Sequence, residues 1–184
     1  MRVDMDLFHR VEAGVCPPTL RFFCFQEPTV SYGLLQKLAD IAPLVPAGWD
    51  IVQRPTGGGI VYHNGDLCLS LAWPAGTSLV PRRPQEQYRW IHAVILEALL
   101  HEKGLRMAAC GDVPPPKEPF GRRSCFKNPV GYDLMRDQEK IVGGALRRTR
   151  RATLYQGSIQ LPFSKQRETR LSIAFEQALQ FSHV

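Results

Sequence analysis

Short runs in which apolar, aromatic or β-branched residues alternate with polar ones occupy most of this chain, and this pattern is typical of strands with one buried face. The predicted strands cover residues 19–26, 29–33, 49–54, 60–63, 66–73, 105–110, 132–136, 140–147 and 152–161. Asn64 and Gly65 join two of these runs. Because Asn-Gly accepts the positive φ angles of a tight turn, it predicts a hairpin between 60–63 and 66–73.

Helical periodicity marks the segments 34–41, 85–103 and 165–181. In the longest of them, apolar side chains recur at helical spacing, at Tyr88, Ile91, Ile95 and Leu99. Strands and helices together predict an α+β fold, a mostly antiparallel sheet with covering helices. No shift in composition marks a boundary, so we expect a single domain spanning residues 1–184.

Composition excludes several classes of protein. Of the 184 residues, 44% are hydrophobic, which is enough for a full core and argues against disorder. No run approaches the roughly 20 apolar residues of a membrane span, and residues 1–10 lack the apolar centre of a signal peptide. The five cysteines form no Cys-x-x-Cys pair, which argues against a metal site and against a disulfide framework. We therefore expect a cytoplasmic protein without membrane contact.

The charge balance favours acidic partners. Lys and Arg number 23 against 17 Asp and Glu, for a formal net charge of +6. Four arginines gather at 147–151, but no aromatic residues are interleaved with them as in a nucleic-acid-binding surface, so we expect no nucleic acid partner.

The first candidate for chemistry is the segment RPTGGGIVYH at 54–63. Three consecutive glycines expose backbone N–H groups that can hold a carboxylate or phosphate, and Arg54 adds a charged donor. A tight turn is the alternative. The segment is neither a Walker loop nor a dinucleotide-binding motif. His63 at its end is a candidate ligand or proton donor, with a hydrogen-bonded structural histidine as the alternative.

Two further segments carry candidate residues. Cys125 lies in a polar stretch beside Arg122, Arg123 and Lys127, and nearby positive charge favours the nucleophilic thiolate. The other four cysteines are interpreted as buried structural residues. Lys140 begins the strand EKIVGGALRR, where it is either a buried charge beside a ligand or an ordinary solvated lysine.

In this order and spacing, the motifs resemble the lipoate and biotin protein ligase superfamily. RPTGGGIVYHNGDLCLS is similar to its signature loop, EKIVGGALRR followed by LYQGSI to its lysine-glycine strands, and RFFCFQEPTVSYGLLQ to its opening strands. The resemblance covers about residues 5–162 and implies that superfamily's catalytic-domain fold. The positions that it assigns to binding the acyl group or adenylate are Arg54, Thr56, Gly57, Gly58, Gly59, Ile60, Val61, Tyr62, His63, Gly143, Gly144, Ala145 and Gly157.

A finer resemblance is to the cysteine-dependent octanoyltransferases of this superfamily, carried by RSCFKNPVGYDL and by Lys140. It implies that Cys125 takes an octanoyl group from acyl carrier protein as a thioester, that Lys140 keeps Cys125 activated, and that the acceptor is a lysine of a lipoyl domain. No cofactor is implied for this transfer. The sequence departs from the superfamily at Gln53, at Leu146, and at Gln156, where a histidine is usual.

Two alternatives remain open at this stage. One is an ATP-dependent lipoate ligase that uses Mg with ATP and lipoate or octanoate, and in which Cys125 is incidental. The other is a non-catalytic relative that binds an acyl chain or a lipoylated partner. Lipoate ligases have an accessory domain or subunit, and none fits into the 22 residues after Pro162.

Overall fold

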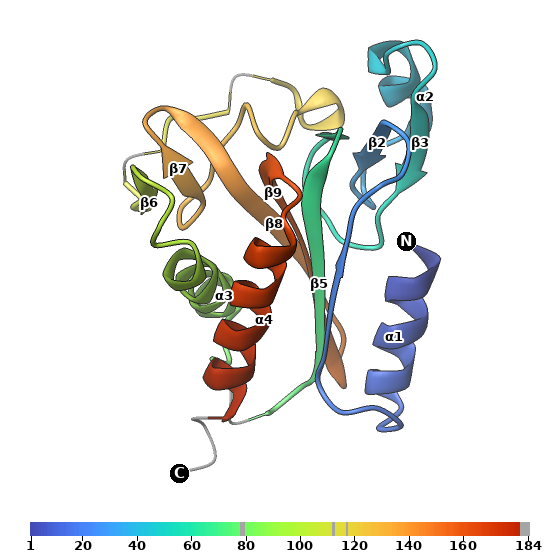
Figure 1. Ribbon diagram of the computed structural model, residues 1–184. Helices are drawn as coiled ribbons and strands as arrows, with labels where there is room; N and C mark the ends of the chain where they lie inside the picture. Colours follow the sequence, from blue (N-terminus) through green and yellow to red (C-terminus); the bar gives the residue numbers. More distant parts are fainter. Residues whose placement is uncertain (78–79, 112, 117, 181–184) are drawn as a thin grey trace.

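The computed structural model describes residues 1–77, 80–111, 113–116 and 118–180 (Figure 1). The helices are α1 (Arg2–Glu12), α2 (Leu38–Ile41), α3 (Pro84–Ala98) and α4 (Lys165–Gln180), with 3₁₀ turns η1 (Ala42–Leu44) and η2 (Phe120–Arg122). The strands are β1 (Thr19–Phe23), β2 (Thr29–Tyr32), β3 (Asp50–Gln53), β4 (Val61–His63), β5 (Asp66–Pro74), β6 (Leu105–Met107), β7 (Leu134–Arg136), β8 (Glu139–Arg148) and β9 (Ala152–Pro162). Among these helices, none has the length and apolar character needed to cross a membrane.

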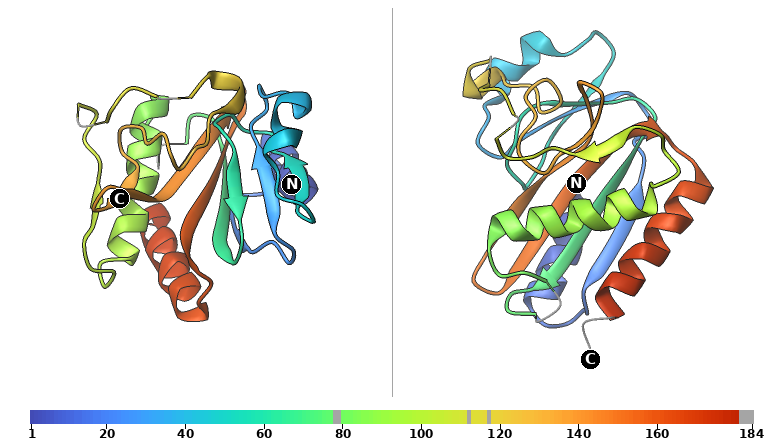
Figure 2. Two further views of the ribbon diagram at one scale, coloured as in Figure 1. Left: turned by 90° about the horizontal axis from the view of Figure 1, so that it is seen from above. Right: turned by 90° about the vertical axis from the view of Figure 1, so that its left-hand side faces the viewer.

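A six-stranded antiparallel sheet forms the centre, in the order β1-β5-β9-β8-β7-β6. Helices α3 and α4 lie side by side on one face and α1 covers the other (Figures 1 and 2). Alternation along β5 explains both contacts, because Leu69 and Leu71 join the core under α3 and α4, while Ala72 packs with Phe8 of α1. Full burial of a side chain such as Phe8 contributes about 1.5–3 kcal/mol.

A smaller three-stranded sheet stands beside the large one, in the order β3-β2-β4. Its β2 pairs parallel with β3 and antiparallel with β4. It has a core of its own, in which Val30 and Ile60 pack with Ile41 of α2. The fold is α+β with a mostly antiparallel sheet, as the sequence pattern predicts.

The predicted hairpin between 60–63 and 66–73 is wrong. Asn64 and Gly65 do form a turn, with Gly65 at φ +82°. However, β4 pairs with β2 in the small sheet, whereas β5 pairs with β1 and β9 in the large one. The turn therefore passes the chain from the small sheet to the large one.

Other boundaries move by less, and one helix was not expected. The predicted helix 34–41 shrinks to α2. The backbone N–H of Leu34 donates to the distant Thr56 carbonyl, and that of Gln36 donates to the Gly33 carbonyl in a turn. The predicted helix 85–103 ends at Ala98. The helix predicted at 165–181 is α4, and residue 181 lies outside the described residues. Helix α1 was missed, although Phe8 and Val11 have helical spacing.

Candidate active site

Arg54 organises the glycine loop from inside. Its guanidinium is buried and donates hydrogen bonds to the carbonyls of Gly57 (3.2 Å) and Gly59 (2.6 Å) and to the hydroxyl of Ser31 (2.7 Å). These bonds hold the loop in shape, with Gly58 in the left-handed region at φ +88°. The N–H groups of Arg54, which the sequence suggested would bind an anion, thus donate to the loop's own carbonyls and to Ser31.

Gly59 allows the cysteine segment to dock on this loop. A Cβ at position 59 would lie 2.2 Å from the carbonyl oxygen of Arg123. That close approach lets Ile60 donate to Arg123 (2.8 Å) and Cys125 donate to the Ile60 carbonyl (2.8 Å), forming a parallel bridge between Ile60 and Ser124. Glu118 secures the same segment by accepting from the backbone N–H of Ser124 at 2.7 Å. The glycine at 59 therefore positions Cys125.

Lys140 reaches Cys125 from the large sheet. Its Nζ lies 3.4 Å from the Cys125 Sγ and 3.2 Å from the Cys125 carbonyl oxygen. The pairing of β7 with β8 shifts by one residue after Lys140, and such a bulge turns Lys140 and Gly143 to the same side of the strand. A Cβ at Gly143 would lie 2.0 Å from the lysine Cε, so this glycine makes the space for the lysine side chain.

Asp133 completes this arrangement and was not singled out from the sequence. Its carboxylate is fully buried and lies 2.8 Å from the Nζ of Lys140. Burial alone would lower the pKa of Lys140, but the negative charges of Cys125 and Asp133 and their hydrogen bonds outweigh burial and raise this pKa above its ordinary value. Lys140 is therefore an ammonium group at neutral pH, and its Nζ lies against the Cys125 sulfur.

A tyrosine and a histidine support Asp133 from α3. Tyr88 donates from its hydroxyl to Asp133 (2.6 Å) and accepts from the backbone N–H of Gly144 (3.0 Å). Burial lowers the pKa of His92 to about 4, so its imidazole is neutral at neutral pH. His92 contacts the Tyr132 carbonyl through Nδ1 (2.7 Å) and the Tyr155 hydroxyl through Nε2 (2.8 Å). These contacts order the floor of the site.

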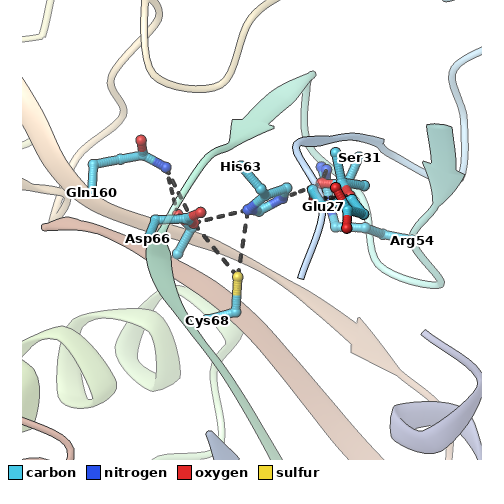
Figure 3. A network of polar contacts seen from close by, with 9 residues as sticks. Glu27, Ser31, Arg54, His63, Asp66, Cys68 and Gln160 are labelled. Atoms are coloured by element: carbon cyan, nitrogen blue, oxygen red, sulfur yellow. Dashed lines mark hydrogen bonds and ion pairs between the residues drawn. The ribbon is translucent and has the colours of Figure 1, made fainter. Parts of the chain in front are cut away.

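His63 belongs to a second polar cluster beside the first (Figure 3). Its Nδ1 lies 2.8 Å from a carboxylate oxygen of Asp66, and its Nε2 lies 2.6 Å from the hydroxyl of Ser31. Cys68 lies 3.4 Å from the same Nδ1. His63, Asp66 and Cys68 each offer one atom that could bind a metal ion, and these three atoms lie within 4.8 Å of one another. Each of the three side chains already contacts another of them. The sequence indicated His63 but none of its three partners, Ser31, Asp66 and Cys68.

Gln156 occupies the position where the superfamily usually has histidine. Its side-chain oxygen accepts from the hydroxyl of Thr56 (2.9 Å), and its nitrogen donates to the buried carboxylate of Asp4 (2.7 Å). Asp4 is also paired with Arg21 at 2.7 Å. Gln156 and Thr56 therefore connect the glycine loop to helix α1 through a buried hydrogen-bond network.

A narrow cavity lies where these groups meet. Its open space is about 30 Å³, room for one or two water molecules. Both sheets supply its lining, which combines polar groups with the apolar side chains of Phe23, Val61 and Leu69. Eight of the residues expected at the site line it: Arg54, Val61, His63, Cys125, Gly143, Gly144, Ala145 and Gly157.

The remaining expected residues are not among those that line this cavity. Ile60 packs in the small core, and Tyr62 donates to the Leu44 carbonyl from the outer side of the small sheet. Thr56 is buried and donates from its hydroxyl to the side-chain oxygen of Gln156. Nothing in the described structure lies within 4 Å of a Cβ built on Gly57. Gly144 and Gly157 make room for the ring of Tyr155, which would lie 2.5 Å from a Cβ at either position.

Comparison with known proteins identifies the family. The model of the lipoyl protein ligase A/B catalytic domain matches residues 1–178. The chain belongs to this family. Octanoyltransferase LipM of Macrococcus caseolyticus is 33% identical over 168 residues, which are 86% of this chain and 60% of that protein. LipM of Geobacillus kaustophilus is 33% identical over 175 residues, 90% of this chain and 62% of that protein. The chain thus spans about 60% of the length of these lipoyl protein ligase A/B relatives.

Solved structures share the fold of the family. Lipoate-protein ligase A bound with ATP has a TM-score of 0.65 and 19% identity, over 97% of this chain and 77% of that one. A bi-partite lipoate protein ligase with its E2 lipoyl domain from Thermoplasma acidophilum has a TM-score of 0.52 and 18% identity, over 98% and 76%. The superfamily resemblance seen in the sequence is confirmed.

Proposed function

We propose that this protein transfers an octanoyl or lipoyl group to the acceptor lysine of a lipoyl domain through a thioester on Cys125. The observation that carries the proposal is the 3.4 Å contact between the Cys125 Sγ and the Lys140 ammonium, which is buried and paired with Asp133. The similarity to proteins named octanoyltransferase supports it. We propose an acyl carrier protein as the donor.

In the first half-reaction, the Cys125 thiolate attacks the thioester carbonyl of the donor. A new carbon–sulfur bond forms, and the carrier thiolate leaves as the tetrahedral intermediate collapses. Because one thioester replaces another, the step is close to balanced in free energy and needs no ATP. Backbone N–H groups of the loop at 57–59 are the candidates for stabilising the oxyanion.

In the second half-reaction, the acceptor amine attacks the acyl group on Cys125. The carbon–nitrogen bond of the amide forms, and Cys125 leaves as a thiolate. Lys140 stabilises that leaving thiolate as it stabilised the attacking one. Lys140 is paired with the buried carboxylate of Asp133 at 2.8 Å, so its ammonium is not the group that accepts the proton that the amine must lose.

The apolar side chains of the cavity are our candidates for contact with the acyl chain. The cavity holds only one or two water molecules, so the chain must widen it between the two sheets. All five cysteines are free, which suits the reducing cytoplasm in which we place the reaction.

Intact mass spectrometry with octanoyl-carrier protein and no ATP tests this proposal. The wild type is expected to gain the mass of one octanoyl group and to lose it when a lipoyl domain is added. Cys125→Ser is expected to gain none. Cys110→Ser is the matched control, because Cys110 is exposed and any unspecific acylation would occur there first.

Two outcomes would favour the alternatives. An adduct that appears only with ATP, Mg and free lipoate or octanoate, and that persists in Cys125→Ser, would make the protein a lipoate ligase. Binding of lipoyl domains or octanoate without transfer under either condition would make it a non-catalytic relative.

A further inference from the structure

The second half-reaction needs a proton acceptor, and the contact between Cys125 and Lys140 does not supply one. The attacking amine must lose a proton as the amide forms. The ammonium of Lys140 already carries its full complement of protons and is neutralised by Asp133 at 2.8 Å. A proton acceptor is needed only if the transfer proposed above takes place.

A serine, a histidine and an aspartate form a line of polar contacts (Figure 3), and the first two of them line the same cavity. Ser31 lies on β2, His63 ends β4, and Asp66 begins β5. The distances along the line are 2.6 Å from Ser31 Oγ to His63 Nε2 and 2.8 Å from His63 Nδ1 to the Asp66 carboxylate. Ser31, His63 and Cys125 all line the cavity, so an amine that attacks an acyl group on Cys125 enters beside the serine hydroxyl.

The hydrogen bonds around this line fix its direction. Arg54 can only donate to the Ser31 oxygen (2.7 Å), so the hydroxyl hydrogen of Ser31 is available for Nε2 of His63. Burial opposes ionisation of Asp66, but its pKa is lowered, first by the hydrogen bond from His63 and also by those from Ser158 and Cys68. Asp66 is therefore a carboxylate that accepts from Nδ1–H, which leaves Nε2 as a proton acceptor.

We propose that Ser31, His63 and Asp66 form a proton relay that deprotonates the acceptor amine when it attacks the Cys125 thioester. As the carbon–nitrogen bond forms, Ser31 Oγ takes one proton from the amine and passes its own to His63 Nε2. The carbon–sulfur bond breaks, and Cys125 leaves as a thiolate beside Lys140. The imidazolium is stabilised by Asp66, which offsets the nearby charge of Arg54, and it then releases its proton to solvent.

The relay should accelerate deacylation by an amine but not by a thiolate, so the two nucleophiles can be compared. A thiolate that attacks the same acyl group carries no proton to lose. Cys125 is first loaded with octanoyl in each variant, and the acyl-enzyme is then mixed with a lipoyl domain or with a small thiol such as mercaptoethanol. Intact mass follows deacylation by each nucleophile.

His63→Gln and Ser31→Ala are expected to slow deacylation by the lipoyl-domain amine by roughly 10²-fold, the contribution of a general base. Deacylation by the thiol is expected to slow much less, so the ratio of the amine rate to the thiol rate should fall by a similar factor. Cys125 is still expected to load octanoyl, so that both rates can be measured. Gln160→Ala is the matched control. Gln160 contacts Asp66 from outside the line (3.4 Å), so its loss should leave the ratio of the two rates unchanged.

Each other outcome decides against a specific proposal. Failure of the wild type to load octanoyl on Cys125 would overturn the proposed function itself. Normal loading, with amine deacylation as fast in His63→Gln and Ser31→Ala as in the wild type, would overturn the relay alone. If one variant slows both nucleophiles equally, its role is structural, and the same result in both variants also overturns the relay.

Discussion

Asp133 shows how one buried carboxylate determines the charge of the site. It accepts from Tyr88 through one oxygen, and its other oxygen contacts Lys140 and accepts from the backbone N–H of Val130 (2.6 Å). A buried ion pair is costly to break because the remaining partner loses both water and its counter-ion. Asp133 therefore acts together with Cys125 to keep Lys140 charged, and the ammonium of Lys140 loses its buried counter-ion when Asp133 is removed.

Replacing Asp133 by asparagine removes that counter-ion and leaves a buried ammonium. We expect Asp133→Asn to lower the free energy of unfolding by about 3–5 kcal/mol, as measured by urea denaturation. Glu168→Gln is the comparison, since it breaks the exposed pair with Lys165 (3.1 Å) and should cost less than about 1 kcal/mol. Equal losses in the two variants would show that the buried pair does not govern stability.

Single residues were predictable from the sequence to different degrees. Cys125 and Lys140 were found, but their contact was implied only by the family resemblance, because a separation of fifteen positions along the chain carries no signal of proximity. Asp133 and Ser31 were missed. Each is one polar residue within an ordinary strand or turn pattern, and only tertiary packing brings it to the site.

At the scale of elements, the bulge in β8 and the glycine after it decide where the lysine points. Lys140 and Gly143 would face opposite sides of a regular strand, since side chains alternate. The extra residue reverses that alternation, and the missing Cβ of Gly143 leaves room for the lysine chain above it. The lysine of this motif thus packs its side chain along its own strand, over the glycine at 143.

Gly143→Ala should separate the lysine from the cysteine without unfolding the domain. The added methyl would lie 2.0 Å from Cε and 2.4 Å from Nζ of Lys140, both at the movable end of a side chain. We expect a stability loss of about 1–3 kcal/mol and a much larger loss in the rate of octanoyl loading, measured by thermal unfolding and by intact mass. Gly111→Ala, with nothing within 4 Å of its Cβ, should change neither. Octanoyl loading by Gly143→Ala at the wild-type rate would contradict this role of Gly143.

Most strands could be predicted from alternation, but their partners could not. The runs around β5, β8 and β9 were found with small errors at their ends, because their apolar sides meet a continuous core. The Asn-Gly turn was read as a hairpin because local turn chemistry cannot reveal that β4 pairs with β2. Helix α1 was missed, since its apolar stripe is short and its buried Asp4 interrupts it.

At the scale of the whole molecule, the positive charge bears on the proteins that it meets. The net charge is +6, and Arg147 of the arginine-rich segment 147–151 also donates to the Pro55 carbonyl beside the glycine loop (3.3 Å). Positive charge is thus present next to the site. Complementary charge on a partner speeds encounter more than it strengthens the final complex.

Transfer from a carrier protein should therefore depend on salt. Between about 50 and 500 mM NaCl, we expect kcat/KM for octanoyl-carrier protein to fall roughly tenfold, because screening removes electrostatic steering. A neutral small octanoyl thioester should show little change in the same assay. If both donors respond equally, salt acts on the chemistry or on the fold, and steering is excluded.

Cys125, the proposed nucleophile, and Lys140 are anchored in different sheets. The loop of Cys125 is bridged to Ile60 at the start of the small sheet, whereas Lys140 stands on β8 of the large one. Any parting of the sheets that admits a fatty chain also draws the sulfur away from the ammonium. We therefore expect the Cys125 sulfur to be least reactive while the two sheets are apart. Its reactivity should be highest once the sheets have closed over the bound acyl chain and restored the contact with Lys140.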